Sequence, residues 1–214
     1  IGWTANITCT EPPTPETGDN CFEAVPFCSD QSYFFPNNFG NSNDAPSGPN
    51  YGCLYSQPNA IWYYLKIAQS GPIQLGLSQT NTGGSGIDID FAMWGPFNNL
   101  SVGCNTVMGG ASPLQCSYSA SATETIGIGM TGGYSTGQST PPMAQAGEYY
   151  IVVMTNYNGA QGNISLNQTA GTGSTDCSIL VPCDITSLTA TPSSCDDQTN
   201  TFSVTGTVEF SDQP

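Results

Sequence analysis

Two aspartates one residue apart are the strongest candidates for chemistry in this sequence. Asp88 and Asp90 lie in residues 87–94 (IDIDFAMW), where apolar and polar side chains alternate. The alternation predicts a β-strand with both carboxylates on one face, about 7 Å apart. Like charges at that distance repel each other unless a cation lies between them. Ca²⁺, which prefers oxygen ligands, is therefore one interpretation of the pair. A solvated acid pair without a ligand is the other.

Paired carboxylates also catalyse glycoside hydrolysis when they lie about 5 to 9 Å apart. Such enzymes usually surround the sugar with basic side chains, whereas this chain has one Lys or Arg and no His. The lack of His also excludes Ser-His-Asp and Cys-His nucleophile systems. We therefore expect the chain not to be an enzyme.

The charge balance restricts the partners of the chain. Sixteen Asp and Glu oppose a single basic residue, Lys66, so that the net charge is −15. Because binding of phosphate groups depends on Lys and Arg, we expect no nucleic-acid partner. An anionic membrane surface would repel the chain. The longest apolar run, residues 149–154, is too short to span a bilayer, and no direct membrane insertion is expected.

Nine cysteines predict a disulfide-linked protein of an oxidising compartment, either extracellular or at the cell surface. Their spacing fits neither a zinc site nor a CxxC redox pair. The odd number leaves one cysteine free or paired outside this sequence. Sequence spacing leaves the connectivity open. Proximity along the chain favours three pairs: Cys28 with Cys53, Cys104 with Cys116, and Cys183 with Cys195.

Short alternating segments between Gly- and Pro-rich turns predict an all-β fold. The alternating segments are residues 60–68, 73–79, 87–94, 122–130 and 163–168. Residues 147–157 are apolar on both faces, which predicts a strand inside a sheet rather than at its edge. The turn after it predicts a hairpin with the next strand, and residues 104–115 are expected to form a loop. The pattern indicates an antiparallel jelly-roll-like β-sandwich stapled by disulfides.

Changes in composition predict three parts of the chain. Residues 1–20 are a Pro-rich linker, and residues 21–176 form the sandwich. Two further alternating strands follow, at residues 185–190 and 201–210, and two strands are too few to bury a core of their own. We therefore expect residues 177–214 to be the first part of a second β-sandwich. Docking of these strands on the first sandwich is the alternative.

Several short motifs follow one another along residues 20–180. They are NCF at 20–22, PFC at 26–28, FPN at 35–37, GPNYGCL at 48–54, IWYY at 61–64, DIDF at 88–91, WGPF at 94–97, GEYY at 147–150 and TNY at 155–157. Together they resemble a module of very large surface proteins of Bacteroidetes, which include gliding-motility adhesins and other exports of the type IX secretion system. The strand pattern is also similar to CUB-like and pre-peptidase C-terminal domains. The tail from Cys183 resembles the start of an immunoglobulin-like repeat.

The resemblance implies a non-enzymatic adhesin module of a large secreted repeat protein, used in surface attachment or gliding motility. The partners it implies are surface polysaccharides or other cells, together with neighbouring repeats of the same chain. CUB-like domains hold calcium through an acidic strand and nearby loops. By that likeness the calcium ligands are Asp88 and Asp90, joined by Asp44 or Glu148. The resemblance carries over no catalytic residue.

Aromatic rings offer a second kind of contact, because a flat ring covers the apolar face of a sugar. Tyr118 and Tyr134 lie in expected loops and are the candidate ligand contacts, whereas Trp62 and Trp94 lie in expected strands and are assigned to the core. The alternative function is therefore a carbohydrate-binding accessory module of a secreted hydrolase. Other rings available for such contacts include Tyr51, Tyr55 and Tyr157.

Overall fold

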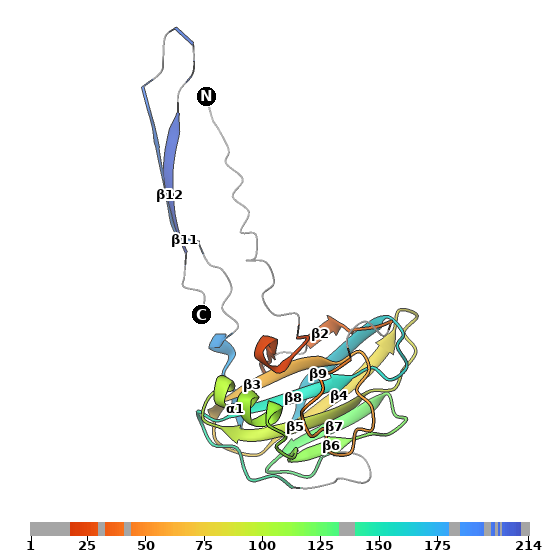
Figure 1. The fold of residues 1–214 in the computed structure, drawn as a ribbon. Helices are drawn as coiled ribbons and strands as arrows, with labels where there is room; N and C mark the ends of the chain where they lie inside the picture. The colour runs from red at the N-terminus through yellow and green to blue at the C-terminus, as the bar shows by residue number, and fades with distance from the viewer. Residues whose placement is uncertain are drawn as a thin grey trace. The chain divides into compact units, whose positions relative to one another are not determined.

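A computed structural model provides the fold of the chain (Figure 1). It describes residues 18–29, 33–40, 44–132, 140–179, 185–194, 198–199, 201 and 203–210. The chain divides into two compact units, a larger one over Pro15–Cys177 and a smaller one that includes Ser178–Pro214. Within the described ranges, no helix has the length and apolar character needed to cross a bilayer.

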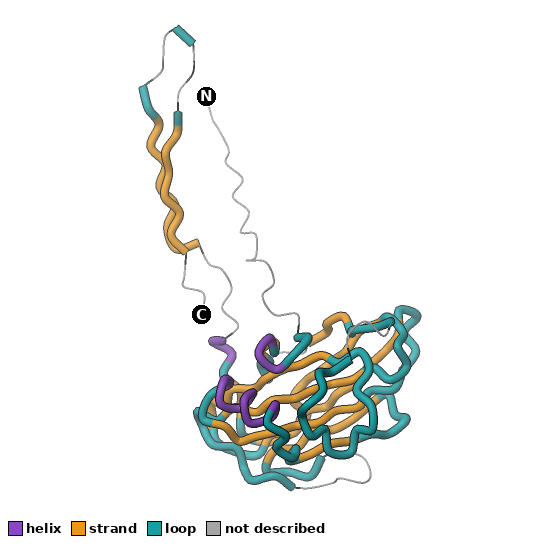
Figure 2. The backbone as a smooth tube through the Cα atoms, in the orientation of Figure 1, coloured by secondary structure: helices purple, strands orange, loops and turns teal. Residues whose placement is uncertain are grey.

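The larger unit consists of two β-sheets (Figure 2). The first sheet contains β1 (Val25–Pro26), β3 (Ile61–Gln69), β5 (Asp90–Phe97), β6 (Gln115–Ser117), β8 (Tyr149–Thr155) and β10 (Ser174–Thr175). Their order is β1-β3-β8-β5-β6, and β10 also pairs with β3. The second sheet has the order β2-β9-β4-β7. Its strands are β2 (Tyr33–Pro36), β4 (Ile73–Asn81), β7 (Thr123–Ile128) and β9 (Gly162–Gly171).

The main core lies between apolar faces of the two sheets. Along β4, buried and half-buried residues alternate, so that Leu75 and Leu77 point into this core. Phe91 and Met93 of β5 reach it from the first sheet. Because side chains of a strand alternate between its faces, the period of two in the sequence predicts this arrangement. The expected β-rich, disulfide-containing sandwich is confirmed.

A second core covers the outer face of the first sheet. Trp62 and Trp94 are buried there and stack with ring centroids 5.7 Å apart, which confirms their assignment to the core. Val153 of β8 also belongs to this second core, whereas its neighbour Val152 belongs to the main core. β8 lies between β3 and β5 and is buried on both faces. The prediction that this strand lies inside a sheet is therefore confirmed.

Residues 100–108 form a helix, and its second half, residues 104–108, falls within the loop expected over residues 104–115. This helix, α1 (Leu100–Met108), begins after Asn99, whose Oδ1 accepts a hydrogen bond from the N–H of Val102 at 2.8 Å. Such a cap satisfies a backbone donor that the first turn leaves unpaired. Cys104 and Val107 of the helix are buried in the second core. Contact with that core explains how so short a helix is stable. Two further single turns are 3-10 helices, η1 (Cys21–Glu23) and η2 (Cys177–Ile179).

The hairpin expected after residues 147–157 is not formed. β8 pairs with β3 and β5, whereas β9 pairs with β2 and β4 of the other sheet. The chain therefore crosses from one sheet to the other between Thr155 and Gly162. Both flanks of β8 are occupied by strands of its own sheet, which leaves no edge at which β9 can pair.

Three disulfides staple the described part of the larger unit: Cys21–Cys104, Cys28–Cys177 and Cys53–Cys116. The expected pairs Cys28–Cys53 and Cys104–Cys116 are wrong, although all four residues form disulfides. Closeness along the chain misleads because strand pairing and the packing of α1 bring distant segments together. The expected pair Cys183–Cys195 lies outside the described residues. The disulfides indicate an oxidising, extracytoplasmic compartment.

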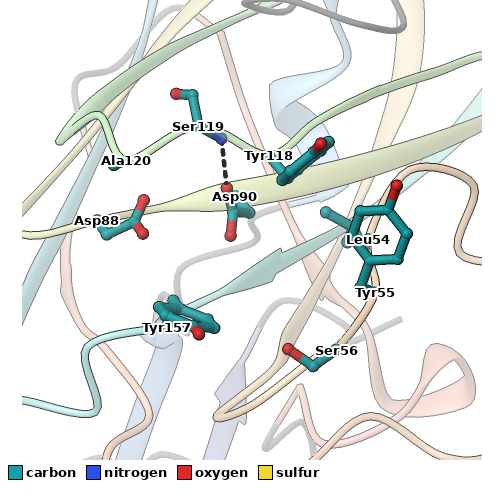
Figure 3. A pocket seen from close by; sticks show the side chains of 9 residues that line it. All are labelled: Leu54, Tyr55, Ser56, Asp88, Asp90, Tyr118, Ser119, Ala120 and Tyr157. Atoms are coloured by element: carbon teal, nitrogen blue, oxygen red, sulfur yellow. Dashed lines mark hydrogen bonds between the residues drawn. The ribbon is translucent and has the colours of Figure 1, made fainter.

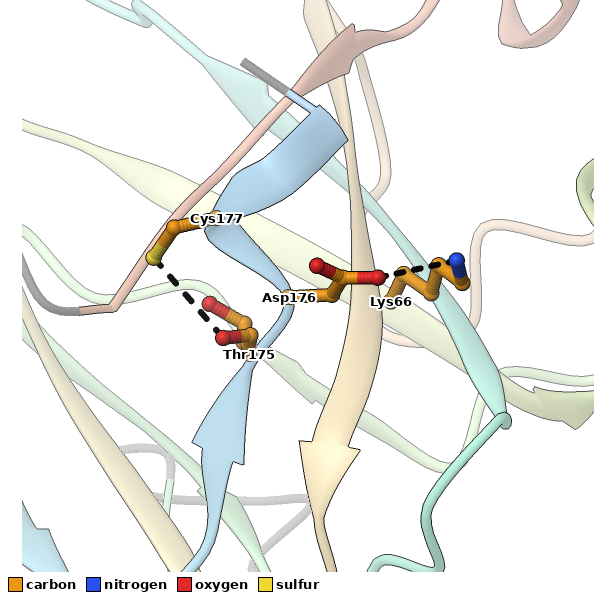
Figure 4. Close-up of polar contacts among 4 residues, drawn as sticks. All are labelled: Lys66, Thr175, Asp176 and Cys177. Atoms are coloured by element: carbon orange, nitrogen blue, oxygen red, sulfur yellow. Dashed lines mark hydrogen bonds and ion pairs between the residues drawn. The ribbon is translucent and has the colours of Figure 1, made fainter. Parts of the chain in front are cut away.

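The end of the larger unit is fastened to β3 near its single basic residue (Figure 4). Lys66 Nζ lies 2.8 Å from Asp176 Oδ2, and the Asp176 N–H donates to the Lys66 carbonyl at 2.6 Å. In the register of the sheet, Lys66 is opposite Tyr149, the first residue of β8. The only Lys or Arg of the chain is therefore paired at that end of the sheet.

Among its described residues, the smaller unit contains one antiparallel pair of strands. β11 (Ile185–Pro192) pairs with β12 (Val204–Phe210). Both segments are predicted as strands from their alternation, and that prediction is confirmed.

Candidate binding site

A cavity of about 390 Å³ opens at the end of the first sheet where β5 begins and where β6 and β8 end (Figure 3). Strand register explains why distant segments meet there, since Asp90 is opposite Thr155 and Phe91 is opposite Ser117. Residues of the loop that follows Cys53 line another side. The lining residues are Leu54, Tyr55, Ser56, Asp88, Asp90, Tyr118, Ser119, Ala120 and Tyr157.

Three tyrosines form the rim of this cavity. The exposed fractions of Tyr55, Tyr118 and Tyr157 are 87%, 39% and 63%. The rings of Tyr55 and Tyr118 meet edge to face, with centroids 5.2 Å apart. Figure 3 shows the carboxylate of Asp90 between Tyr118 and Tyr157. A gathering of exposed aromatic surface around a cavity is typical of an interaction site.

The two predicted aspartates lie together in the cavity. Asp90 is the first residue of β5 and only 7% exposed, and its Oδ1 accepts the N–H of Ser119 at 3.0 Å. Burial and the charges of Asp88 and Glu124 raise the pKa of Asp90 to about 7, although the Ser119 hydrogen bond acts in the opposite direction. Burial also raises the pKa of Asp88. Ile89 between them points into the main core, as the alternation predicts.

Glu124 is a third carboxyl group that sequence reasoning missed. It lies in β7 of the second sheet, is only 5% exposed, and accepts a hydrogen bond from Ser119 Oγ at 2.6 Å. Its pKa is raised, first by burial and further by the charge of Asp88. A signal was present in the sequence, because Glu124 is in phase with the buried Ile126 and Ile128. An acid on the inward face of a strand indicates a special environment.

Buried oxygens without a hydrogen-bond partner gather around these acids. Among the described residues, such atoms include Asp88 Oδ1, Glu124 Oε2, Thr155 Oγ1 and Gln79 Oε1. Thr155 is opposite Asp90 in the sheet, and Gln79 Nε2 donates to the Asp88 carbonyl at 3.3 Å. Buried polar atoms are normally paired. All four atoms can accept a hydrogen bond or bind a cation, and Asp88 is the one of these four residues that lines the cavity.

The cavity brings together the expected calcium ligands Asp88 and Asp90 without either of the acids expected to join them, Asp44 or Glu148. Asp88 and Asp90 share the cavity, but Asp44 is not among its lining residues. Glu148 precedes β8 at the strand end opposite to Thr155, and its Oε2 accepts from the Gln145 N–H at 2.7 Å. Of these acids, only Asp88 and Asp90 line the cavity.

The acidic side chains at this site are too few to hold a metal ion by themselves. In the described part of the chain, no three Asp, Glu or Cys side chains are arranged to hold a metal ion. A calcium ion at Asp88 and Asp90 therefore requires neutral oxygens as additional ligands, and Thr155 Oγ1 and Gln79 Oε1 are unpartnered oxygens of that kind.

The candidate contact tyrosines have different outcomes. Tyr118 lines the cavity, whereas Tyr134 lies outside the described residues. Tyr55 and Tyr157 complete the rim. From the sequence, they are only two of several aromatic residues available for ligand contacts. In comparisons with known proteins, no family model and no curated protein matches this chain.

Proposed function

We propose that the larger unit is a non-enzymatic binding module of a cell-surface adhesin. Its contact site is the Tyr–Asp pocket, defined as Tyr55, Tyr118, Tyr157, Asp88 and Asp90 with the cavity between them, and its ligand is a surface polysaccharide. The observation that carries the proposal is the gathering of three exposed rings over two carboxylates.

The chemistry of the pocket suits a sugar. Tyrosine rings cover the apolar faces of pyranose rings, and carboxylates accept hydrogen bonds from hydroxyl groups. The volume of about 390 Å³ falls within the range of roughly 300 to 1,000 Å³ that small-molecule sites occupy. The lining residues include no basic group that would assist hydrolysis, which favours binding over catalysis.

The motifs that resemble Bacteroidetes surface proteins support a place in a long repeat protein. In that interpretation, β11 and β12 begin an immunoglobulin-like repeat, and many copies of weak sites raise the effective concentration of the ligand. The alternative, an accessory module of a secreted hydrolase, uses the same pocket. A catalytic domain elsewhere in the full-length gene would favour that alternative.

A structural calcium ion is a second candidate role for the same carboxylates. The unpartnered oxygens of Asp88, Thr155 and Gln79 favour it. When bound, the ion would offset the repulsion between Asp88 and Asp90. Thermal melting in CaCl₂ and in EDTA tests this role. A higher midpoint in calcium, lost in Asp88→Asn, supports it, whereas equal midpoints contradict it.

Retention of the full chain on a panel of immobilised polysaccharides tests the binding function. We expect at least one polysaccharide to retain the chain, and Tyr118→Ala or Tyr157→Ala to weaken that retention about tenfold, which corresponds to about 1.4 kcal/mol. Phe22→Ala is the matched control, because Phe22 is exposed but does not line the pocket. No retention by any polysaccharide, or equal retention of all variants, contradicts the proposal.

A further inference from the structure

We propose that the ligand of the Tyr–Asp pocket is a positively charged polysaccharide, one whose sugars carry free amino groups. This inference rests on the proposed binding function and names its ligand class. Three independent features of the pocket support it: the missing counter-charge, the unpartnered acceptor atom and the aromatic rim.

The carboxyl groups of the pocket lack a cation from the chain itself. Asp88 and Asp90 of the pocket interact electrostatically with each other and with Glu124, which lies outside its lining. The only Lys or Arg, Lys66, is paired with Asp176. The sheet register places Lys66 beside the first residue of β8 and Asp90 beside the last. At about 3.3 Å per residue, these positions are roughly 20 Å apart. A positive charge at the pocket must therefore come from a ligand.

The unpartnered atom of the pocket specifies a donor. Asp88 lines the pocket, and its Oδ1 is buried without a hydrogen-bond partner. Once ionised, carboxylates only accept hydrogen bonds, and an ammonium group offers three donors together with a positive charge that favours the ionised forms of Asp88 and Asp90. A charged hydrogen bond of this kind is about twice as strong as a neutral one. An amino group thus satisfies the pocket better than a hydroxyl group does.

The aromatic rim is compatible with both parts of such a ligand. A cation over a tyrosine face gains about 0.5 to 1 kcal/mol at an exposed site. The cavity of about 390 Å³ exceeds the needs of a single ammonium group and leaves room for a pyranose ring against Tyr118 or Tyr157. The net charge of −15 attracts a cationic polymer and repels uronate or sulfated ones. These features favour an amino sugar over a lysine side chain of a protein.

The test compares two oligosaccharides with the same sugar backbone, one with free amino groups and one in which these groups are acetylated and uncharged. Titration calorimetry of the full chain at pH 6 in EDTA uses a β-1,4-linked glucosamine hexamer and its fully N-acetylated counterpart. We expect the glucosamine hexamer to bind at least tenfold more tightly. Asp88→Asn and Asp90→Asn should remove this preference, whereas Asp44→Asn, which removes the same charge outside the pocket, should keep it.

Each other outcome overturns the inference. Equal affinity for both hexamers overturns the charge requirement and leaves the polysaccharide function standing. Equal weakening by Asp44→Asn and Asp90→Asn would mean that the net charge alone attracts the hexamer. Tighter binding of a lysine-rich peptide than of the glucosamine hexamer would assign the site to a protein partner. If neither hexamer binds, the ligand class is wrong, and the polysaccharide panel decides separately whether the binding function stands.

Discussion

Cys28 and Cys177 are 149 residues apart in the sequence and are joined by a disulfide beside β3. β1 precedes Cys28 and β10 precedes Cys177, and both strands pair with β3. Next to the disulfide, the Ser29 N–H donates to Thr175 Oγ1 at 2.6 Å, and the Thr175 N–H donates to Ser29 Oγ at 3.0 Å. The segments by which the chain enters and leaves the larger unit are therefore covalently tied.

This tie predicts how the larger unit responds to force. When the full chain is pulled from both ends, the disulfide carries the load between Cys28 and Cys177, and the sandwich between them is not extended. In the double variant Cys28→Ser, Cys177→Ser, the Cys21–Cys104 disulfide still transmits the force past the residues between Cys21 and Cys104. The segment from Cys104 to Cys177 is then free to extend. At about 3.4 Å per residue, that segment extends by about 250 Å. Single-molecule pulling measures this step, and an identical step in the oxidised wild type contradicts the prediction.

The raised pKa of Asp90 predicts an unusual pH dependence of stability. The pKa is about 7 in the folded chain, against an ordinary value of 3.8. Between these values the folded state keeps a proton that the unfolded state has lost, so stability falls as pH rises. We expect the melting midpoint in EDTA to fall between pH 4.5 and pH 7.5.

Asp90→Asn tests the cause of this fall. Asparagine cannot ionise, and its Oδ1 can still accept the Ser119 N–H, so the variant should melt above the wild type at pH 7.5 and show a shallower fall. Asp88 and Glu124 also face Asp90 with raised pKa values, and they leave a residual slope. Tyr55, Tyr118 and Tyr157 are the other titratable groups that line the cavity. A midpoint of Asp90→Asn below that of the wild type at pH 7.5 would contradict the account.

The rim and the core should respond differently to substitution. Tyr157→Ala removes an exposed ring, and we expect it to change the free energy of unfolding by less than about 0.5 kcal/mol. Trp94→Ala leaves a cavity in the second core, where the ring is buried against Trp62, and we expect a loss of about 3 to 5 kcal/mol. Chemical denaturation measures both. Comparable losses in the two variants would mean that Tyr157 serves the fold rather than a ligand.

Removal of the cap of α1 provides a further stability test. The side chain of Asn99 pairs with the N–H of Val102, and we expect Asn99→Ala to destabilise the larger unit by about 1 kcal/mol. Asn99→Asp retains the acceptor and should keep most of that stability. If denaturation midpoints of the two variants fall equally, the cap is not the cause.

Local periodicity predicts the parts of the fold that depend on one segment at a time. The alternation along residues 87–94 correctly assigns Phe91 and Met93 to one face and Trp94 to the other, because neighbouring side chains point to opposite sides whatever the strand pairs with. The same reasoning finds the double-sided burial of β8. The aspartate pair is found for the same reason, although the strand β5 begins at Asp90 rather than at residue 87, so that Asp88 precedes it.

Relationships between distant segments are what the sequence does not reveal. The partner of Cys104 is Cys21 rather than the nearby Cys116, since α1 packs beside η1. Tyr157 and Glu124 approach Asp90 only because strands from both sheets end at the same place. The pairing of these strands involves residues far apart along the chain, so no local pattern specifies it.

The most direct measurement for the central claim maps the binding site by NMR. The ¹⁵N-labelled chain is titrated with the glucosamine hexamer, or with an oligomer of whichever polysaccharide retains it best. We expect the shifted amides to cluster at residues 54–56, 88–90, 118–120 and 157, with the Ser119 amide among them. Shifts confined to other parts of the sandwich, with the Ser119 amide unchanged at saturation, would contradict the assignment of the Tyr–Asp pocket as the binding site.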